Sequence, residues 1–275
     1  MTRLTDKVAL ITGAGRGIGL AIAEKLGQEG ARLVINDLDE EPASQAVQSL
    51  KERGYQAVAC VGSVTEHGFA ERFIQTAIDE FGGVDIIINN AGYTWDGVIQ
   101  KMTDEQFQAM LDVHMVAPFR ILRAAAPFIR QASKAEVAEG RVVHRKIVNV
   151  SSITGIVGLA GQANYSSAKA GLIGFTKTMA KEWGRYNVNV NCVAFGHIDT
   201  RMTATYEDAP SKVDIGGRDI VVGIPKQMVD DYVATIPLGR VGTPQDAAGS
   251  VFLLCSPEAD YISGQVLQVT GGAVE

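Results

Sequence analysis

Short apolar runs rich in β-branched residues alternate with longer helical patterns along almost the whole chain, and this alternation constrains the fold more than any other feature. The runs cover residues 8–11, 33–35, 57–61, 84–88, 147–150, 188–193 and 266–269. Strands that are apolar throughout, with helices between them, are typical of a parallel sheet buried on both faces. We therefore expect an α/β fold with a doubly wound, seven-stranded parallel sheet flanked by helices.

Helical patterns fill the intervals, and two segments depart from the rhythm. The helices are expected near residues 17–29, 40–53, 66–82, 104–131, 163–184, 226–233 and 244–255. Residues 132–146 are polar and extend a helix end or form a surface loop, and residues 199–237 carry glycines and prolines without clear periodicity until about 226. A long irregular segment is often a lid. We expect one domain over residues 1–275, with a substrate lid at about 199–237.

Charge and composition exclude several classes of partner. The formal net charge is −6, which argues against nucleic acid or an anionic membrane. The chain has no apolar run of signal-peptide or membrane-spanning length. Its three cysteines lie far apart and its four histidines lack metal-ligand spacing. We expect a cytoplasmic protein with buried thiols and with no metal, nucleic acid or membrane partner.

The first strand leads into a glycine-rich turn at residues 12–19, which a helical pattern follows at once. Gly13, Gly17 and Gly19, with Arg16 and Ile18 between them, form this turn. Glycines let the backbone approach a ligand closely, and the helix N-terminus offers N–H groups and a positive dipole end to phosphate. The strand–turn–helix setting predicts dinucleotide binding in a Rossmann fold. No Lys-Ser/Thr pair follows the last glycine, which disfavours a nucleoside-triphosphate loop.

The second and fourth predicted strands end in residues that suit the same ligand. Asp37 follows the second strand, and an acidic side chain there accepts hydrogen bonds from the adenosine ribose and repels a 2′-phosphate. This favours NAD over NADP, although Arg16 is a cation that favours the phosphate. The fourth strand ends at 89–92, where small residues and an amide can lie against a flat cofactor.

A candidate chemical centre follows the fifth strand. Ser152 ends that strand, and Tyr165 and Lys169 lie at i and i+4 on one face of the next predicted helix. A neighbouring ammonium favours phenolate, so we expect Lys169 to lower the pKa of Tyr165 and make it an acid–base group nearer neutral pH. Ser152 can donate a hydrogen bond to the same substrate oxygen.

With these residues the chain resembles the short-chain dehydrogenase/reductase superfamily over nearly its whole length. The matching motifs are Thr12-Gly-x-x-x-Gly-x-Gly19, Asn89-Asn-Ala-Gly92, Ser152 and Tyr165-x-x-x-Lys169. Residues 161–165, 169–175, 236–240 and 261–264 are similar to 3-oxoacyl-(acyl-carrier-protein) reductases. The resemblance implies an oxidoreductase that moves a hydride between a nicotinamide dinucleotide and a carbonyl or alcohol carbon.

The resemblance also implies roles for individual residues. Tyr165 is the general acid in reduction, Lys169 lowers its pKa and holds the nicotinamide ribose, and Ser152 orients the substrate oxygen. The expected cofactor contacts are Gly13, Arg16, Gly17, Ile18, Gly19, Asp37, Leu38, Ser63, Val64, Asn90, Ala91, Gly92, Val113, Tyr165, Lys169, Ile198 and Thr200. The expected substrate contacts are Ser152, Trp95, Gln162, Phe195 and Met202.

Three positions depart from the family pattern. His114 stands where the family usually has an Asn whose main-chain carbonyl, at a helix irregularity, helps hold a relay water. We count His114 among the catalytic residues and expect its backbone to keep that role. Ser63 replaces a usual Asp, which predicts weaker adenine binding, and Phe195 replaces the proline of a Pro-Gly pair, beside the nicotinamide or the substrate.

Several functions fit these residues. The first is reduction of a 3-oxoacyl thioester by NADH. Within the same class, an NAD-dependent dehydrogenase of a small secondary alcohol, a hydroxysteroid or a sugar alcohol also fits, since Asp37 departs from the NADPH use of biosynthetic reductases and the lid lacks a basic cluster. Outside it, a catalytically silent dinucleotide-binding regulator remains open. The resemblance further implies a homotetramer.

Overall fold

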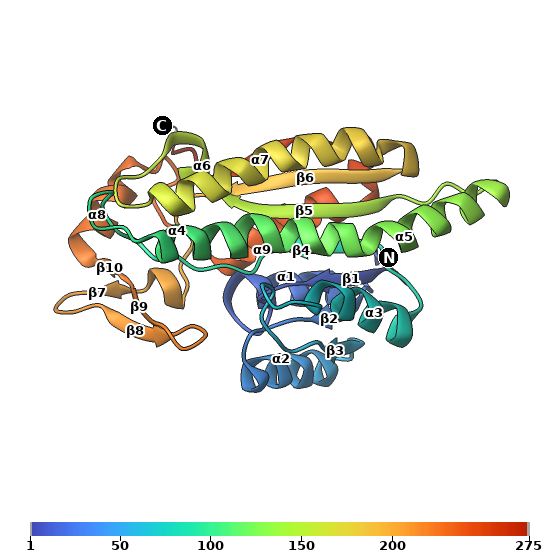
Figure 1. The fold of residues 1–275 in the computed structure, drawn as a ribbon, viewed down its shortest axis with the longest axis horizontal. Helices are drawn as coiled ribbons and strands as arrows, with labels where there is room; N and C mark the ends of the chain where they lie inside the picture. The colour runs from blue at the N-terminus through green and yellow to red at the C-terminus, as the bar shows by residue number, and fades with distance from the viewer. Residues whose placement is uncertain (1, 274–275) are drawn as a thin grey trace.

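The computed structural model describes residues 2–273, and a parallel sheet of seven strands forms its centre (Figure 1). The strand order is β11-β6-β5-β4-β1-β2-β3, and every neighbouring pair is parallel. The strands are β1 (Val8–Ile11), β2 (Arg32–Ile35), β3 (Ala57–Ala59), β4 (Ile86–Asn89), β5 (Arg145–Ser152), β6 (Val188–Phe195) and β11 (Val266–Val269). This confirms the predicted α/β architecture.

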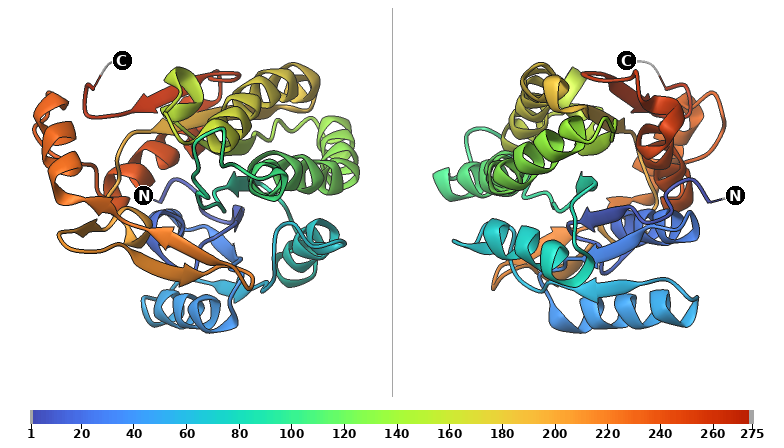
Figure 2. Two further views of the ribbon diagram at one scale, coloured as in Figure 1. Left: turned by 60° about the vertical axis from the view of Figure 1, so that its left-hand side comes forward. Right: turned by 90° about the vertical axis from the view of Figure 1, so that its right-hand side faces the viewer.

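Helices cover both faces of the sheet, as the two views of Figure 2 show. Over the described residues the α-helices are α1 (Gly17–Gln28), α2 (Glu40–Glu52), α3 (Phe69–Phe81), α4 (Asp104–Leu111), α5 (Ala117–Ala138), α6 (Thr154–Val157), α7 (Ala163–Trp183), α8 (Lys226–Thr235) and α9 (Pro244–Cys255). Of these, α8 lies outside the central sheet, in the segment 199–237. One buried cluster packs Leu26 of α1 and Val251 of α9 on one face, and a second packs Phe73 of α3 and Ile121 of α5 on the other. Because both faces are covered, β1 and β4 are buried along their whole length.

The helix expected over 104–131 is interrupted, which corrects that prediction. A single π-helical turn, Asp112–Val116, separates α4 from α5. Such a turn inserts one extra residue in the helix and often lies at a functional site. The polar segment 132–146 takes both expected forms: α5 extends to Ala138, and residues 139–144 form a loop before β5 begins at Arg145. The buried Arg145 guanidinium binds both carboxylate oxygens of Glu136, at 2.9 and 2.6 Å, and so joins the helix extension to the sheet.

The segment 199–237 is more regular than its sequence indicates. After a short 3₁₀ turn, Arg201–Thr203, the two-residue strands β7 (Thr205–Tyr206) and β10 (Ile224–Pro225) pair in parallel. Between them, β8 (Ser211–Asp214) and β9 (Asp219–Val222) form an antiparallel hairpin. In Figure 1 this hairpin lies at the lower left, beyond the carboxyl ends of the central strands. Across the described part of the chain, no helix is both long enough and apolar enough to cross a membrane.

Candidate active site

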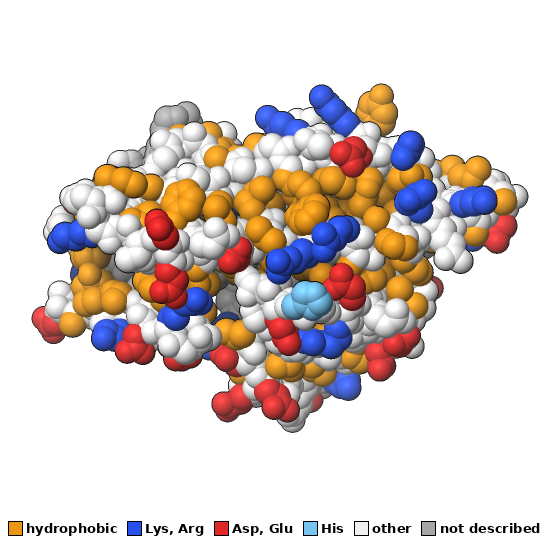
Figure 3. All heavy atoms as spheres, viewed as in Figure 1, with side chains coloured by type: hydrophobic (Ala, Val, Ile, Leu, Met, Phe, Trp, Pro, Cys, Tyr) orange, Lys and Arg blue, Asp and Glu red, His pale blue; other side chains and the backbone are white. Residues whose placement is uncertain are grey.

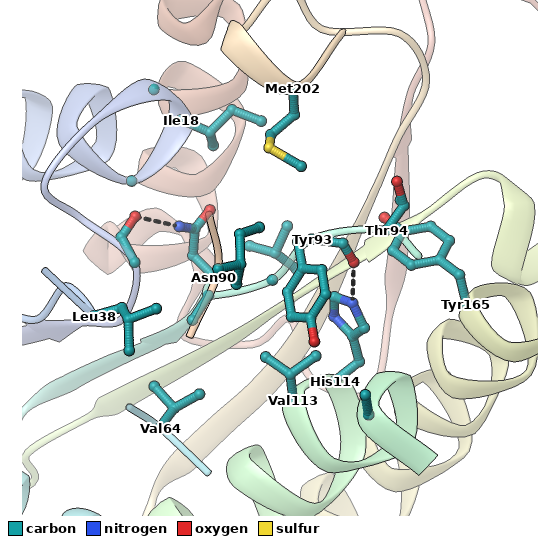
Figure 4. A pocket seen from close by; sticks show the side chains of 18 of the residues that line it. Ile18, Leu38, Val64, Asn90, Tyr93, Thr94, Val113, His114, Tyr165 and Met202 are labelled. Atoms are coloured by element: carbon teal, nitrogen blue, oxygen red, sulfur yellow. Dashed lines mark hydrogen bonds between the residues drawn. The ribbon is translucent and has the colours of Figure 1, made fainter. Parts of the chain in front are cut away.

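A cavity of about 1090 Å³ lies along the carboxyl ends of the sheet strands, where open α/β sheets bind their ligands. It is lined by 21 residues of the predicted site: Gly13, Arg16, Gly17, Ile18, Gly19, Asp37, Leu38, Ser63, Val64, Asn90, Ala91, Gly92, Val113, His114, Ser152, Tyr165, Lys169, Phe195, Ile198, Thr200 and Met202. The fold therefore brings the glycine turn and the predicted chemical centre to one cavity. Figure 4 shows part of its lining, from Ile18 and Leu38 on one side to Tyr165 on the other.

The glycine turn is packed against the end of β4. Gly13 has a φ of +61°, and a Cβ atom there would lie 2.8 Å from the Ala91 Cα. The Asn90 side-chain amide donates to the carbonyl oxygens of Thr12 and Gly13 at 2.9 and 3.0 Å. With no side chain to displace, the turn and the N-terminus of α1 expose backbone to the cavity, as a dinucleotide phosphate requires.

At the end of β2, backbone N–H groups hold the Asp37 carboxylate in place. Its Oδ2 accepts from the Gly15 N–H at 3.0 Å, and its Oδ1 accepts from the Asp39 N–H at 3.3 Å. Arg16, the cation that favours a 2′-phosphate, pairs instead with Asp39 at 3.2 Å. The acidic group thus lies at the cavity wall while the neighbouring cation is already paired.

Lys169 projects from α7 toward the end of β5. Its ammonium donates to the Val150 carbonyl at 2.7 Å and lies 5.4 Å from the centroid of the Tyr165 ring. Ser151 fixes the helix to the strand, because its hydroxyl donates to the Lys169 carbonyl at 2.9 Å. Burial lowers the pKa of Lys169 to about 8. The charged ammonium is therefore the major form at neutral pH, and it is lost as the pH rises through about 8.

The prediction that the pKa of Tyr165 is lowered was wrong, because the structure raises it. Burial of the phenol raises its pKa to about 12, against the smaller lowering effect of a hydrogen bond with Ser152, and Asp96 adds a further increase. The Lys169 ammonium lies 5.4 Å from the ring centroid and donates to the Val150 carbonyl, and it does not reverse this increase. Tyr165 is consequently a protonated phenol at neutral pH, which suits a proton donor.

His114 lies in the π-helical turn, which agrees with the helix irregularity expected at this position. The residue is 2 % exposed, and its Nε2 lies 2.8 Å from the Tyr93 carbonyl oxygen (Figure 4). The ring meets Tyr165 edge to face, with centroids 5.0 Å apart and planes at 87°. Burial, and then the Lys169 charge, holds the pKa of His114 well below its usual range.

The end of the cavity beside Trp95, a predicted substrate contact, is called the substrate end here, and it contains residues that the sequence did not predict. Asp214, Ile215, Gly216 and Arg218, from the β8–β9 hairpin, line it. Arg218 pairs with Glu105 of α4 at 3.0 Å, and its guanidinium lies 5.4 Å from the centroid of the Trp95 ring. The signal was a glycine pair, 216–217, between two short β-prone runs, which is a hairpin pattern.

Two predicted substrate contacts lie outside the cavity lining. The Gln162 amide donates to the Asp96 carboxylate at 2.9 Å, and the Trp95 carbonyl accepts from Asn164 at 2.9 Å. Their contact with substrate stays a prediction. Phe195 and Met202 do line the cavity, and Phe195 is buried at the end of β6.

The described residues contain no group of three or more His, Cys, Asp or Glu side chains placed to hold a metal ion. All three cysteines are free and buried.

Comparison with known proteins places this arrangement in a family. The family model "short chain dehydrogenase" matches residues 7–211. Among curated proteins, a 3-oxoacyl-[acyl-carrier-protein] reductase FabG of Vibrio cholerae is 39% identical over 271 residues, covering 98% of each chain. A protein of the same name from Escherichia coli is 37% identical over 266 residues, covering 97% of this chain and 96% of its own.

The family binds a nicotinamide dinucleotide, and the residues at this cavity fit such a group. The backbone-lined turn at the N-terminus of α1 suits its phosphates, and the carboxylate at the end of β2 suits a ribose. The centre of Ser152, Tyr165 and Lys169 lies on the same cavity. The chain belongs to the short chain dehydrogenase family and is an oxidoreductase that acts on carbonyl or alcohol groups.

Proposed function

We propose that this enzyme uses NADH to reduce the 3-oxo group of an acyl thioester to the 3-hydroxy group. The observation that carries the proposal is the grouping of Ser152, Tyr165 and Lys169 on the cavity that also holds the glycine turn and Asp37. The names of the relatives, reductases of 3-oxoacyl chains on a carrier protein, support the substrate class.

The residues act on the substrate oxygen. When bound, the nicotinamide supplies the hydride that reaches the carbonyl carbon. Tyr165 gives its phenolic proton to the carbonyl oxygen, and Ser152 donates a hydrogen bond to the same oxygen. The Lys169 ammonium stabilises the resulting phenolate, which is reprotonated from solvent. In the reverse direction Tyr165 takes the proton from the alcohol.

The preference for NAD over NADP rests on Asp37. Asp37 is 8 % exposed and its carboxylate is oriented by two backbone N–H groups, so it is a fixed acceptor for ribose hydroxyls and repels a 2′-phosphate. The pairing of Arg16 with Asp39 supports the same choice.

A substrate screen tests the proposal. The purified protein is mixed with NADH or NADPH and with 3-oxoacyl thioesters of several chain lengths, small ketones, ketosteroids and ketoses, and oxidation of the cofactor is followed at 340 nm. We expect NADH and 3-oxoacyl thioesters to give the highest kcat/KM. Faster turnover of a small ketone or a steroid would favour the secondary-alcohol dehydrogenase, and cofactor binding without turnover would favour the regulator.

We further propose a cytoplasmic homotetramer built on α4–α5, α7 and the C-terminal strand, with one domain per chain and residues 199–237 as its lid. Figure 3 shows hydrophobic side chains gathered along the face formed by α5 and α7. On the candidate surfaces, Phe119 of α5 is 45 % exposed and Leu267 of β11 is 37 % exposed. Light scattering behind a sizing column tests this: we expect the mass of four chains, and the mass of one would contradict the proposal.

A further inference from the structure

The His114 imidazole is held on three sides by residues of the site. Its Nε2 lies 2.8 Å from the Tyr93 carbonyl, and its ring packs edge to face with Tyr165. On a third side it lies against Gly92, where a Cβ atom would be 2.2 Å from the imidazole Cε1. Only glycine at position 92 leaves room for this ring. The close fit fixes the imidazole orientation.

The contacts also fix the protonation of the ring. A carbonyl oxygen only accepts hydrogen bonds, so the Nε2 must carry the proton that it donates to Tyr93. Burial and the Lys169 ammonium both oppose a second proton, so the ring is neutral and its Nδ1 is a lone-pair acceptor. Among the described residues the buried Nδ1 has no hydrogen-bond partner. A buried acceptor without a partner costs stability and calls for a function.

The Lys169 ammonium is a donor close enough for its charge to act on His114. Its ammonium has three N–H groups, of which one donates to the Val150 carbonyl. Lys169 and His114 line the same cavity, and both contact the Tyr165 ring. Three other titratable residues lie nearby. Tyr93 contacts the imidazole through its backbone carbonyl, Asp96 raises the pKa of Tyr165, and Cys192 raises the pKa of Lys169.

We propose that His114 is a positioning residue for Lys169: its Nδ1 accepts a hydrogen bond from the ammonium, directly or through one water molecule, while its Nε2–H holds the Tyr93 carbonyl. The inference rests on the proposed function, because it assigns the side chain a part in keeping Lys169 charged and in place. It differs from a role carried by the His114 backbone alone, which any side chain would preserve.

Two substitutions separate the two nitrogens. In His114→Asn, the amide oxygen can take the position of Nδ1, so the acceptor remains and the donor to Tyr93 is lost. In His114→Gln, the longer side chain can keep a donor near the Nε2 position, but it has no acceptor at Nδ1. Circular dichroism and thermal unfolding of both variants check that they fold.

The pH dependence of the reductive kcat is the readout that a merely structural role would not move. An acceptor stabilises the ammonium, so its loss lowers the pKa of Lys169 further. In His114→Gln we expect kcat to fall about tenfold and its alkaline limb to move to lower pH by about one unit. In His114→Asn we expect a fall of about threefold, with the limb within roughly 0.3 units of the wild type. The reverse order, or the same limb in all three proteins, would overturn the proposal.

A second measurement needs no turnover and so separates a failure of this inference from a failure of the proposed function. The protein, without cofactor, is labelled with ¹⁵N-histidine, and the His114 resonances are identified by their absence from His114→Asn. We expect the Nε2–H tautomer from pH 5 to 9 and, in Lys169→Met, an Nδ1 resonance shifted toward that of an unbonded lone pair. An Nδ1 resonance unchanged by Lys169→Met, or a protonated ring at pH 6, would overturn the inference even if the enzyme reduces its substrate.

Discussion

The two ends of the cavity are built in different ways. At the cofactor end the contacts are largely to backbone: the Asp37 carboxylate accepts from the N–H groups of Gly15 and Asp39, and the Asn90 amide donates to carbonyls of the glycine turn. At the substrate end the contacts join distant side chains, such as Arg218 of the hairpin and Glu105 of α4. The cofactor end therefore depends on backbone groups that few substitutions remove, whereas the substrate end depends on the identity of individual side chains. We expect substitutions at the two ends to change different kinetic parameters of the enzyme.

The largest effect on kcat is expected at Tyr165, where the cofactor end and the substrate end of the cavity meet. In Tyr165→Phe the ring and its packing against His114 remain, but the proton donor is lost, so kcat should fall about 10²–10⁴-fold. Steady-state kinetics at saturating substrate measure the loss, and fluorescence titration with NADH should show binding within about twofold of the wild type, since the turn is untouched. A variant that kept most of its kcat would remove Tyr165 from the chemistry.

At the cofactor end, Asp37→Ser should change which dinucleotide is used and leave the chemistry intact. Loss of hydrogen bonds to a charged acceptor raises the KM for NADH about 10-fold or more, and loss of repulsion lowers that for NADPH. The ratio of the two kcat/KM values measures the change. Asp39→Ser is the matched control: it frees Arg16, so it should improve NADPH use without a comparable loss with NADH. Equal effects of the two substitutions would contradict the role of Asp37.

The pH dependence of the reductive kcat should follow the titration of one group, Lys169. Lys169, with a pKa of about 8, is charged below that pH and neutral above it, so the reductive kcat should be highest below pH 8 and fall as the pH rises through it. Tyr165, with a pKa of about 12, remains a proton donor over this range, and His114 remains neutral. A pH–rate profile in buffers of constant ionic strength measures this. A reductive kcat that instead rose steadily from pH 7 to 10 would exclude the Lys169 ammonium from the rate-limiting step.

The smallest effect is expected at the substrate end. Arg218→Ala removes a half-exposed ion pair and a cation–π contact, each contributing about 1 kcal/mol or less, so the KM for the thioester should rise roughly three- to tenfold with little change in kcat. Lys212→Ala is the control, because its ion pair with Asp219 lies in the same hairpin but Lys212 does not line the cavity. If both variants raised KM equally, hairpin stability rather than the cavity contact would explain the effect.

The same contrast explains how far the sequence alone could lead. The seven strands and the glycine turn follow from local patterns, because apolar runs and glycine spacing carry their own structural meaning. The π-helical turn at Asp112–Val116 and the hairpin around Gly216 and Gly217 depend on tertiary contacts that no short window contains. The predicted lowering of the pKa of Tyr165 was wrong for a related reason: the i, i+4 spacing places Lys169 nearby but does not show that the phenol is buried, and burial raises the pKa.

The assignment of Ser152, Tyr165 and Lys169 as a hydride-transfer centre is tested most directly by following the transferred hydrogen. The protein is incubated with a 3-oxoacyl thioester and NADH carrying deuterium at C4 of the nicotinamide, in separate preparations for each face, and the products are analysed by mass spectrometry. We predict a 3-hydroxyacyl thioester with one deuterium at C3 from one preparation only, formed at a rate that falls about 10²–10⁴-fold in Tyr165→Phe. A product without deuterium from either preparation, or equal rates in the two proteins, would contradict the assignment of Ser152, Tyr165 and Lys169 as a hydride-transfer centre.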